Sequence, residues 1–389
     1  MEPCEARDPR LAAAWWCAVV EPGDPFAHAL RHALGEEEAL AWAMAPAPGP
    51  LPDDVARGPG GRPRPWQGAW ERWHPRAVVA DPARDLEELE GLGGCLVIPG
   101  GTGWPAGLDD LGANAPHALW VLGGLAAGCS VAVVGARAST SYGNRVAADL
   151  ALEVAEAGID IVSGGAFGID ACAHRGALAA TGGRTTAVMA GGLAHLYPRA
   201  HVDLLHEVAR EGALVSEVPP SWRPARWRFL GRNRLIAALA AATVVVEASV
   251  RSGALSTARH AERMVRHVGA VPGPVTSSSS AGCHHLIREG ATLVQGSRDV
   301  LEMVSSLGAF GAGTAPGAPV EEDRGTDALP AGQRRVWEAL PRRAGTTLER
   351  LARAAGMPQR EVLAALAHLQ LEGLVVAHPL GWARSTRGG

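Results

Sequence analysis

Short apolar runs rich in β-branched residues recur through the middle of the chain, and longer mixed stretches separate them. The runs are three to five residues long and lie at 131–134, 159–162, 185–189, 213–215 and 243–246. Runs that are apolar at successive positions are typical of parallel strands buried on both faces. The stretches between them are long enough for crossover helices. The pattern therefore predicts a doubly wound, Rossmann-like α/β sheet, with a ligand site at the carboxyl ends of its strands.

Stretches rich in Pro and Gly divide the chain around this sheet. Two of them, 46–68 and 306–330, contain too much Pro and Gly for regular structure, so we interpret them as linkers. They separate a small helical N-terminal domain at 5–45 from a Rossmann-like domain at 69–305, whose core is 130–305. A C-terminal module at 331–386 remains.

The C-terminal module has the pattern of a winged helix. Three helices are predicted at 331–340, 347–355 and 358–372, and two short strand-like segments follow at 373–378 and 381–384. Nine Arg against four Glu at 331–387 permit contact with DNA, while a protein-interaction role is the alternative. The third helix offers few side chains for reading base edges, which argues against strong sequence specificity.

The N-terminal segment is not predicted to enter a membrane. Its apolar run at 11–20 is shorter than the roughly 18 residues that a spanning helix needs, and no such stretch follows it. We expect neither export nor insertion. Trp15, Trp16 and Trp42 lie among Ala and Leu at helical spacing, which favours a core role over base stacking.

Charge and cysteine usage narrow the class of protein. The 389 residues carry 36 basic and 40 acidic side chains, so a polybasic protein is excluded and any nucleic-acid surface has to be local. Every basic residue is Arg, which excludes a lysine Schiff base and a P-loop lysine. The six Cys show no CxxC spacing and no clustering, so we expect neither a zinc site nor disulfides, and a cytoplasmic location fits best.

Two Gly-rich loops follow the first two core strands and lead into helices. The first contains Gly135 and Arg137, and the second contains Gly164. Glycine allows close approach of a ligand, and helix N-termini favour anions, so phosphate is the expected guest, although the glycines could equally serve tight turns. Neither loop has the GxGxxG or GxxxxGK[ST] spacing of a dinucleotide or Walker site. Arg137 has no evident structural purpose there and suits a phosphate oxygen.

The strongest local signal is the segment 221–234, with five Arg, three aromatic residues and no acid. Cations interleaved with aromatic rings suit a single nucleic-acid strand, whose phosphates need charge and whose bases stack. The alternative is that Arg232 or Arg234 pairs with Glu217 or Glu247 and braces the sheet. Arg199, which follows the third strand, is expected on the same rim as Arg137.

Asp170 and His174 stand four residues apart on one predicted helix face. They could form an acid/base pair in a Rossmann-type nucleotide hydrolase or phosphoribosyl enzyme. Helix capping by Asp170 and packing of His174 is the commoner explanation of such a pair. A winged-helix transcription factor with a sensory α/β domain is a third possibility.

In order and spacing, the motifs of residues 130–300 resemble the bacterial DNA processing protein A family, also called Smf. The stretches that carry the resemblance are Val134-Gly135-Ala136-Arg137, Ser163-Gly164-Gly165-Ala166-Phe167-Gly168-Ile169-Asp170, Tyr197-Pro198-Arg199, Arg232-Asn233-Arg234-Leu235-Ile236 and Ser252-Gly253-Ala254-Leu255-Ser256-Thr257. The positions Gly165, Phe167, His201 and Gly231 depart from the residues usual in the family.

The resemblance implies a non-enzymatic homodimer, without a cofactor or metal, that binds and protects single-stranded DNA and helps to load the RecA recombinase, in natural transformation where that occurs. It places DNA contacts on Arg137, Arg199, Arg232 and Asn233, and a dimer surface around 282–301. Combined with the loop chemistry, the full set of expected DNA-binding residues is Gly135, Arg137, Gly164, Phe167, Arg199, Arg232, Asn233 and Arg234.

Overall fold

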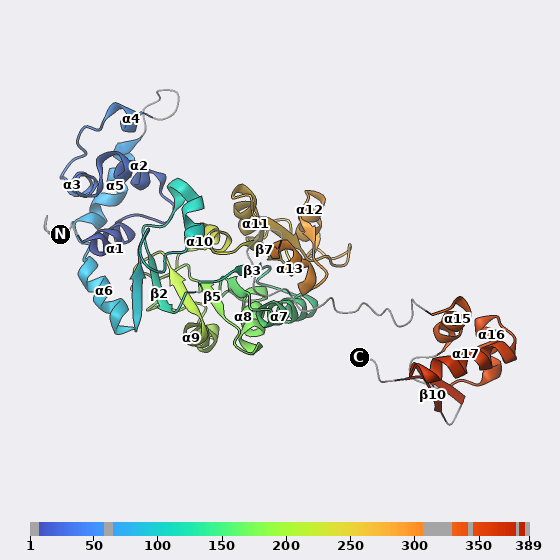
Figure 1. The fold of residues 1–389 in the computed structure, drawn as a ribbon. Helices are drawn as coiled ribbons and strands as arrows, with labels where there is room; N and C mark the ends of the chain where they lie inside the picture. The colour runs from blue at the N-terminus through green and yellow to red at the C-terminus, as the bar shows by residue number, and fades with distance from the viewer. Residues whose placement is uncertain are drawn as a thin grey trace. The chain divides into compact units, whose positions relative to one another are not determined.

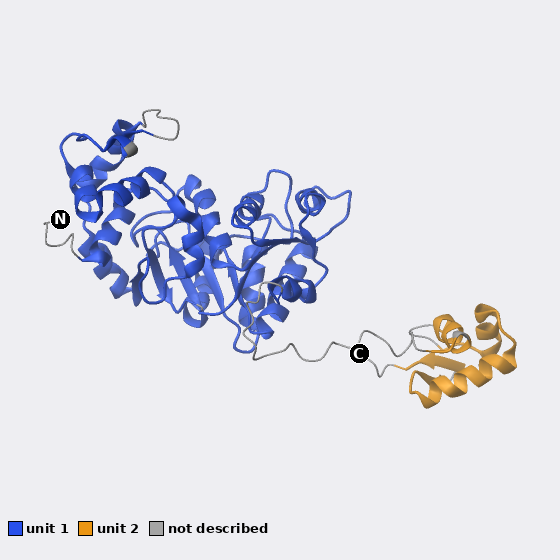
Figure 2. Cartoon of the chain, turned by 45° about the horizontal axis from the view of Figure 1, so that its top comes forward, with its two compact units in different colours: residues 1–313 blue, residues 314–389 orange. Residues whose placement is uncertain are grey.

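The computed structural model describes residues 8–57, 65–125, 127–305, 329–340, 345–378 and 381–385. The chain forms two compact units, residues 1–313 and 314–389 (Figure 2). Most of the predicted linker 306–330, and 58–64 of the predicted linker 46–68, lie outside the described residues.

A nine-stranded sheet runs through the first unit, in the order β1-β2-β6-β5-β4-β3-β7-β8-β9. Its strands are β1 (Gly94–Val97), β2 (Leu119–Gly123), β3 (Ser130–Val134), β4 (Asp160–Ser163), β5 (Thr185–Val188), β6 (Ala213–Ser216), β7 (Ala242–Val245), β8 (His267–Ala270) and β9 (Thr292–Leu293). Strands β3 to β9 pair in parallel, whereas β2 pairs antiparallel with both β1 and β6. The five strands expected from the apolar runs are confirmed, and so is the Rossmann-like fold.

Side chains alternate between the two faces of the sheet and bury a separate core on each. Val131 and Val133 of β3 join one cluster, and Ala132 and Val134 join the other. The first face is covered by α7 (Ser141–Glu156), α8 (Ile169–Ala179) and α9 (Val202–Glu211), and the second by α10 (Arg226–Leu239), α11 (Ala254–Arg263) and α12 (Ala281–Arg288) (Figure 1). Because both faces are covered, the strands can be apolar at every position.

The N-terminal helices form a bundle that extends further than the sequence indicated. Its helices are α1 (Pro9–Val19), α2 (Pro25–Leu34), α3 (Glu36–Met44), α4 (Asp53–Ala56) and α5 (Trp66–Ala77), followed by α6 (Pro82–Gly91). Trp15, Trp16 and Trp42 are buried, as expected. The structure differs from the predicted linker between 45 and 69, because α5 begins inside it and buries Trp66 and Trp73 in the same core.

The second unit is a winged helix, as predicted. Helices α15 (Ala331–Ala339), α16 (Leu348–Ala355) and α17 (Gln359–Leu371) pack around one apolar core, and β10 (Val375–His378) pairs antiparallel with β11 (Gly381–Arg384). The Thr347 hydroxyl accepts the N–H of Arg350 and caps α16. Gly356 ends that helix with φ of 62°, a left-handed conformation that glycine adopts without strain.

In the described part of the chain, no helix is long and apolar enough to cross a membrane.

Candidate nucleic-acid interface

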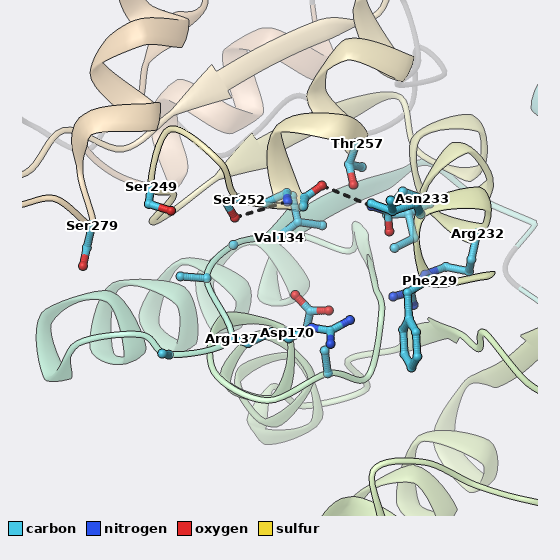
Figure 3. A pocket seen from close by; sticks show the side chains of 18 of the residues that line it. Val134, Arg137, Asp170, Phe229, Arg232, Asn233, Ser249, Ser252, Thr257 and Ser279 are labelled. Carbon is cyan, nitrogen blue, oxygen red and sulfur yellow. Dashed lines mark hydrogen bonds between the residues drawn. The ribbon is translucent and has the colours of Figure 1, made fainter. Parts of the chain in front are cut away.

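A pocket of about 490 Å³ opens at the point where the strand order reverses. The chain leaves β3 toward β4 on one side and returns as β7 on the other, so the loops after β3 and β7 separate there. In open α/β sheets this crevice is the usual ligand site. Its walls come from the loop 134–138, from Ser252 to Ala254, and from the first half of α10 (Figure 3). Three Arg and one Asp line it, so its charge is positive.

The loop after β3 packs closely against the start of α8 and presents Arg137 to solvent. A Cβ on Gly135 would lie 2.5 Å from Ile169, and one on Gly168 would lie 2.3 Å from the Ala136 carbonyl oxygen. Only glycine allows these approaches. The carboxylate of Glu247 accepts the N–H of Thr140 at 2.8 Å and its hydroxyl at 2.6 Å, which fixes the end of the loop.

Arg137 itself is exposed, and its guanidinium stacks on the Phe229 ring, with the carbon 4.6 Å from the ring centroid. The arrangement holds a cation beside an aromatic face at the mouth of the pocket, where phosphate and base of one nucleotide could each find a partner.

Arg232 lies at the base of the pocket and is only 5% exposed. Its Nη1 donates to the Gly164 carbonyl at 2.8 Å and also to the Val188 carbonyl. Gly164 is required here, because a Cβ would lie 2.4 Å from the Arg232 guanidinium and 2.6 Å from the Asp170 carboxylate. Burial lowers the pKa of Arg232 to about 10, although the charge of Asp170 opposes this, so the guanidinium stays charged at neutral pH.

Asn233 joins α10 to the loop after β7. Its amide nitrogen donates to the Gly253 carbonyl at 3.1 Å, and Ser252 accepts the N–H of Ala254 at the start of α11 (Figure 3). The amino-terminal end of α11 therefore faces the pocket, and its dipole adds to the positive charge there. Asn233 is 8% exposed and contributes to the wall of the pocket as well as to its support.

Arg234 does not reach the pocket. It is 4% exposed and forms an ion pair with Glu217, while its Nε donates to the Asn114 carbonyl at 2.8 Å. This is the bracing role that the sequence left open for one of the two arginines. Because buried Arg234 is fully engaged by these partners, we leave it out of the residues proposed to contact DNA.

The loops after β4 and β5 form a second, adjoining part of the rim. Phe167 is half exposed and packs edge-on against His201, whose Nδ1–H donates to the Gly165 carbonyl at 3.3 Å. Tyr197 contacts the Phe229 ring, with centroids 5.9 Å apart, and so connects this loop to the pocket. Arg199 is exposed two residues further on, outside the pocket lining. Of the expected DNA-binding residues, Gly135, Arg137, Arg232 and Asn233 line the pocket, whereas Phe167 and Arg199 lie on this adjoining rim.

Asp170 and His174 are not arranged as an acid/base pair. His174 is fully buried, its Nε2 accepts the N–H of Gly165 and its Nδ1 lies 2.8 Å from the Thr185 hydroxyl. Burial lowers the pKa of His174 to about 3, so it is neutral. Burial raises the pKa of Asp170, opposed chiefly by Arg232. Within the described residues, no group of three or more His, Cys, Asp or Glu could hold a metal ion.

Sequence reasoning missed Arg226 and the role of the loop after β7. Arg226 lines the pocket, as do Ser249 and Ser252. The sequence held a signal for this loop, because Ser252 follows the last predicted core strand, and the carboxyl ends of parallel strands share one edge. Arg226 lies one helical turn before Phe229, so the two share a face of α10.

A doubly wound sheet with a basic pocket at its switch point, in a chain that also contains a winged helix, favours a protein that binds nucleic acid. Comparisons with known proteins give the same class and identify the family. Residues 96–305 match the model of DNA recombination-mediator protein A, and residues 320–381 match the DprA winged helix domain. The chain therefore belongs to the DNA recombination-mediator protein A family, whose members process DNA in recombination.

Individual relatives cover most of the chain. A relative from Mycobacterium tuberculosis, named DNA processing protein DprA, is 46% identical over 79% of this chain and 81% of its own length. Protein Smf of Escherichia coli is 38% identical over 70% of this chain and 72% of its own. The solved structure of DNA processing protein A from Streptococcus pneumoniae aligns with a TM-score of 0.59 at 28% identity, over 75% of this chain and 95% of that one.

Proposed function

We propose that this protein binds single-stranded DNA without sequence specificity, protects it and helps to load the RecA recombinase onto it. The observation that carries the proposal is the exposed Arg137 guanidinium, held 4.6 Å above the Phe229 ring at the mouth of the basic pocket. A cation for phosphate beside a ring for a base is the recognition chemistry of single strands.

Further rings along the rim support a single strand rather than a duplex. Phe167 and Tyr197 are 44% and 45% exposed, and both adjoin the loops that present Arg137 and Arg199. The bases of a duplex are stacked on one another and cannot lie on such rings, whereas the bases of a single strand can. Every base has a face that can stack on a ring. Binding is therefore expected to tolerate any sequence.

The alternative hydrolase or phosphoribosyl activity has weaker support. It needs Asp170 and His174 to reach a substrate together, yet both ring nitrogens of His174 contact the protein and the residue is fully buried. We therefore propose a binding protein that performs no chemistry on the strand.

The double variant Arg137→Ala with Arg199→Ala tests the DNA site. Its affinity for scrambled single-stranded oligonucleotides should fall roughly 100-fold, because each charge-assisted hydrogen bond contributes about 1.5 kcal/mol or more. The slope of log K against log salt should flatten by about 1.4, at about 0.7 per lost phosphate contact. Fluorescence anisotropy at several salt concentrations measures both quantities.

Arg210→Ala is the matched control for that experiment. Arg210 is an exposed Arg at the end of α9, near the opposite edge of the sheet, and pairs with Glu207 and Glu211. It should leave affinity and salt slope unchanged. Unaltered binding by the double variant would contradict the proposed site and shift attention to the winged helix.

We also propose a homodimer through the surface around 282–301. The support is that β9 is the last strand of the sheet, with Thr292 and Leu293 both exposed, so its outer edge offers unpaired backbone groups to a second copy. Leu293→Glu should convert dimer to monomer, because a charge would be buried in the contact. Sedimentation velocity measures this, and an unchanged mass would place the contact elsewhere.

The proposal that RecA receives the strand rests on family membership. Faster RecA filament formation on single strands that carry the protein than on the same strands without it is the result expected in a loading assay, and equal rates would contradict the proposal.

A further inference from the structure

The carboxylate of Glu21 accepts four hydrogen bonds from three side chains, which come from two parts of the first unit. Glu21 follows α1 of the N-terminal bundle, and Arg228 of α10 binds it in a bidentate manner, with both nitrogen–oxygen distances 2.9 Å. Arg76 of α5 donates to it at 2.7 Å, and the indole N–H of Trp227 donates at 3.2 Å. Burial would raise the pKa of Glu21, but hydrogen bonds from Arg228, Trp227 and Arg76 lower it to about 2. It is therefore charged at neutral pH.

Cation and ring contacts extend this network. The Trp222 ring contacts the guanidinium groups of both Arg228 and Arg76, at 4.4 and 5.0 Å from its centroid. Arg228 is nearly buried, so it supports its neighbours rather than meeting solvent. The bundle and the start of α10 are consequently fixed to one another around a single carboxylate.

Trp227 is the exception within this supported group, because 62% of it is exposed. Trp is a residue that folded proteins usually bury to a large extent. Its N–H is tied to Glu21, so the ring is held in one orientation and loses little freedom when it meets a ligand. Arg226, the preceding residue of α10, lines the pocket, so Trp227 lies next to the pocket wall on the same helix, while its own ring points away from Phe229 and is not part of the lining.

We propose that Trp227 stacks a nucleobase outside the pocket, and that Glu21 is a positioning residue that orients its ring for this contact. The site of the proposed function then extends from the Arg137 pocket toward the N-terminal bundle, so the bundle takes part in binding through Glu21. The inference rests on the proposed single-strand binding and adds a second stacking position to it.

The dependence of affinity on oligonucleotide length tests the stacking position. Oligothymidylates of about 4 to about 16 nucleotides cover the usual range of site sizes. Trp227→Ala should leave the shortest strands unaffected and weaken binding of the longest roughly 5-fold to 100-fold, the range of one lost stacked base. Trp227→Phe keeps a ring without the N–H, so its affinity for long strands should lie between those of the unaltered protein and of Trp227→Ala.

Trp104→Ala is the matched control, since the Trp104 N–H also bonds a carboxylate, that of Asp109 at 2.9 Å, and this residue lines a different pocket near the amino ends of the strands. It should bind every length as the unaltered protein does. If Trp227→Ala and the unaltered protein had equal affinities at all lengths, the inference would be overturned. The proposed function would still stand in that case, provided that short strands bound. Absence of binding at every length in the unaltered protein would overturn both.

A double-mutant cycle tests the role of Glu21. Glu21→Gln removes one negative charge and so strengthens DNA binding electrostatically in any background, and the cycle cancels this effect. The effect of Glu21→Gln on long-strand affinity is measured in two backgrounds, one with Trp227 and one with Trp227→Ala. The change should be less favourable to binding in the background that keeps Trp227. Equal effects in the two backgrounds would overturn the positioning role.

Discussion

Replacing Gly168 with alanine is expected to destabilise the first unit by about 3 kcal/mol, the sum of a left-handed backbone and an overpacked contact. Gly168 is the N-cap residue just before α8 and has a φ of 77°. An added Cβ would lie 2.3 Å from the Ala136 carbonyl oxygen and 2.6 Å from that of Arg137. Since both oxygens belong to the backbone, the loop after β3 would have to move, and Arg137 would move with it. Affinity for single-stranded DNA should therefore fall in the protein that remains folded, as measured by urea denaturation and by DNA titration.

Gly182→Ala separates the cost of the backbone conformation from the effect on the loop. Gly182 also has a positive φ, 71°, but a Cβ there would meet open space. It lies between α8 and β5, near the amino ends of the strands. This variant should lose only about 1 to 2 kcal/mol and bind DNA normally. Equal stability and DNA affinity of the two variants would contradict the idea that contact between the two Gly-rich loops positions Arg137.

The part of the fold that follows from local pattern was predictable. Buried parallel strands need apolar side chains on both faces, so 131–134 and its counterparts were recognisable as strands without any tertiary information. Strand β1 does carry an apolar run, at 96–98, but it precedes the region whose pattern predicts the sheet. The edge strand β9 lacks such a run and has only two residues, both exposed, so the tertiary contact that pairs it leaves little trace in its own residues.

The candidate site was predictable as a set of loops, but not residue by residue. Arg232 and Arg234 lie two positions apart in the same basic segment, and the sequence alone does not say which side each takes. On a helix these positions point about 200° apart, so one reaches the base of the pocket and the other reaches Glu217. Burial, not charge, separates their roles.

The extent of the N-terminal bundle was missed for a related reason. Pro-rich and Gly-rich sequence around 46–68 argues against regular structure, yet Trp66 begins α5 and its indole N–H donates to the Val55 carbonyl at 2.9 Å. Edge-on contacts with Phe26 and Trp42 bury the ring. A tertiary aromatic cluster overrides local composition here, because each buried ring contributes a large apolar surface.

Arg234→Met is expected to destabilise the first unit by about 3 to 5 kcal/mol, because it leaves the buried Glu217 carboxylate without its counter-charge. Arg234 and Glu217 have side-chain exposures of 5% and 8%, so water cannot replace the lost partner. The carbonyls of Asn114 and Gly231 also lose their donors. Urea denaturation should show a lower midpoint, and protein that remains folded should bind single strands almost normally.

The double variant Arg234→Met with Glu217→Met should recover part of that stability, since two apolar side chains replace both charges together. Arg210→Ala, which breaks only an exposed pair on α9, should cost less than about 1 kcal/mol. If the double variant were as unstable as the two single changes added together, the ion pair would not be the source of the loss. If Arg234→Met instead abolished DNA binding in a fully folded protein, Arg234 would belong to the DNA site after all, and the distinction drawn between it and Arg232 would fall.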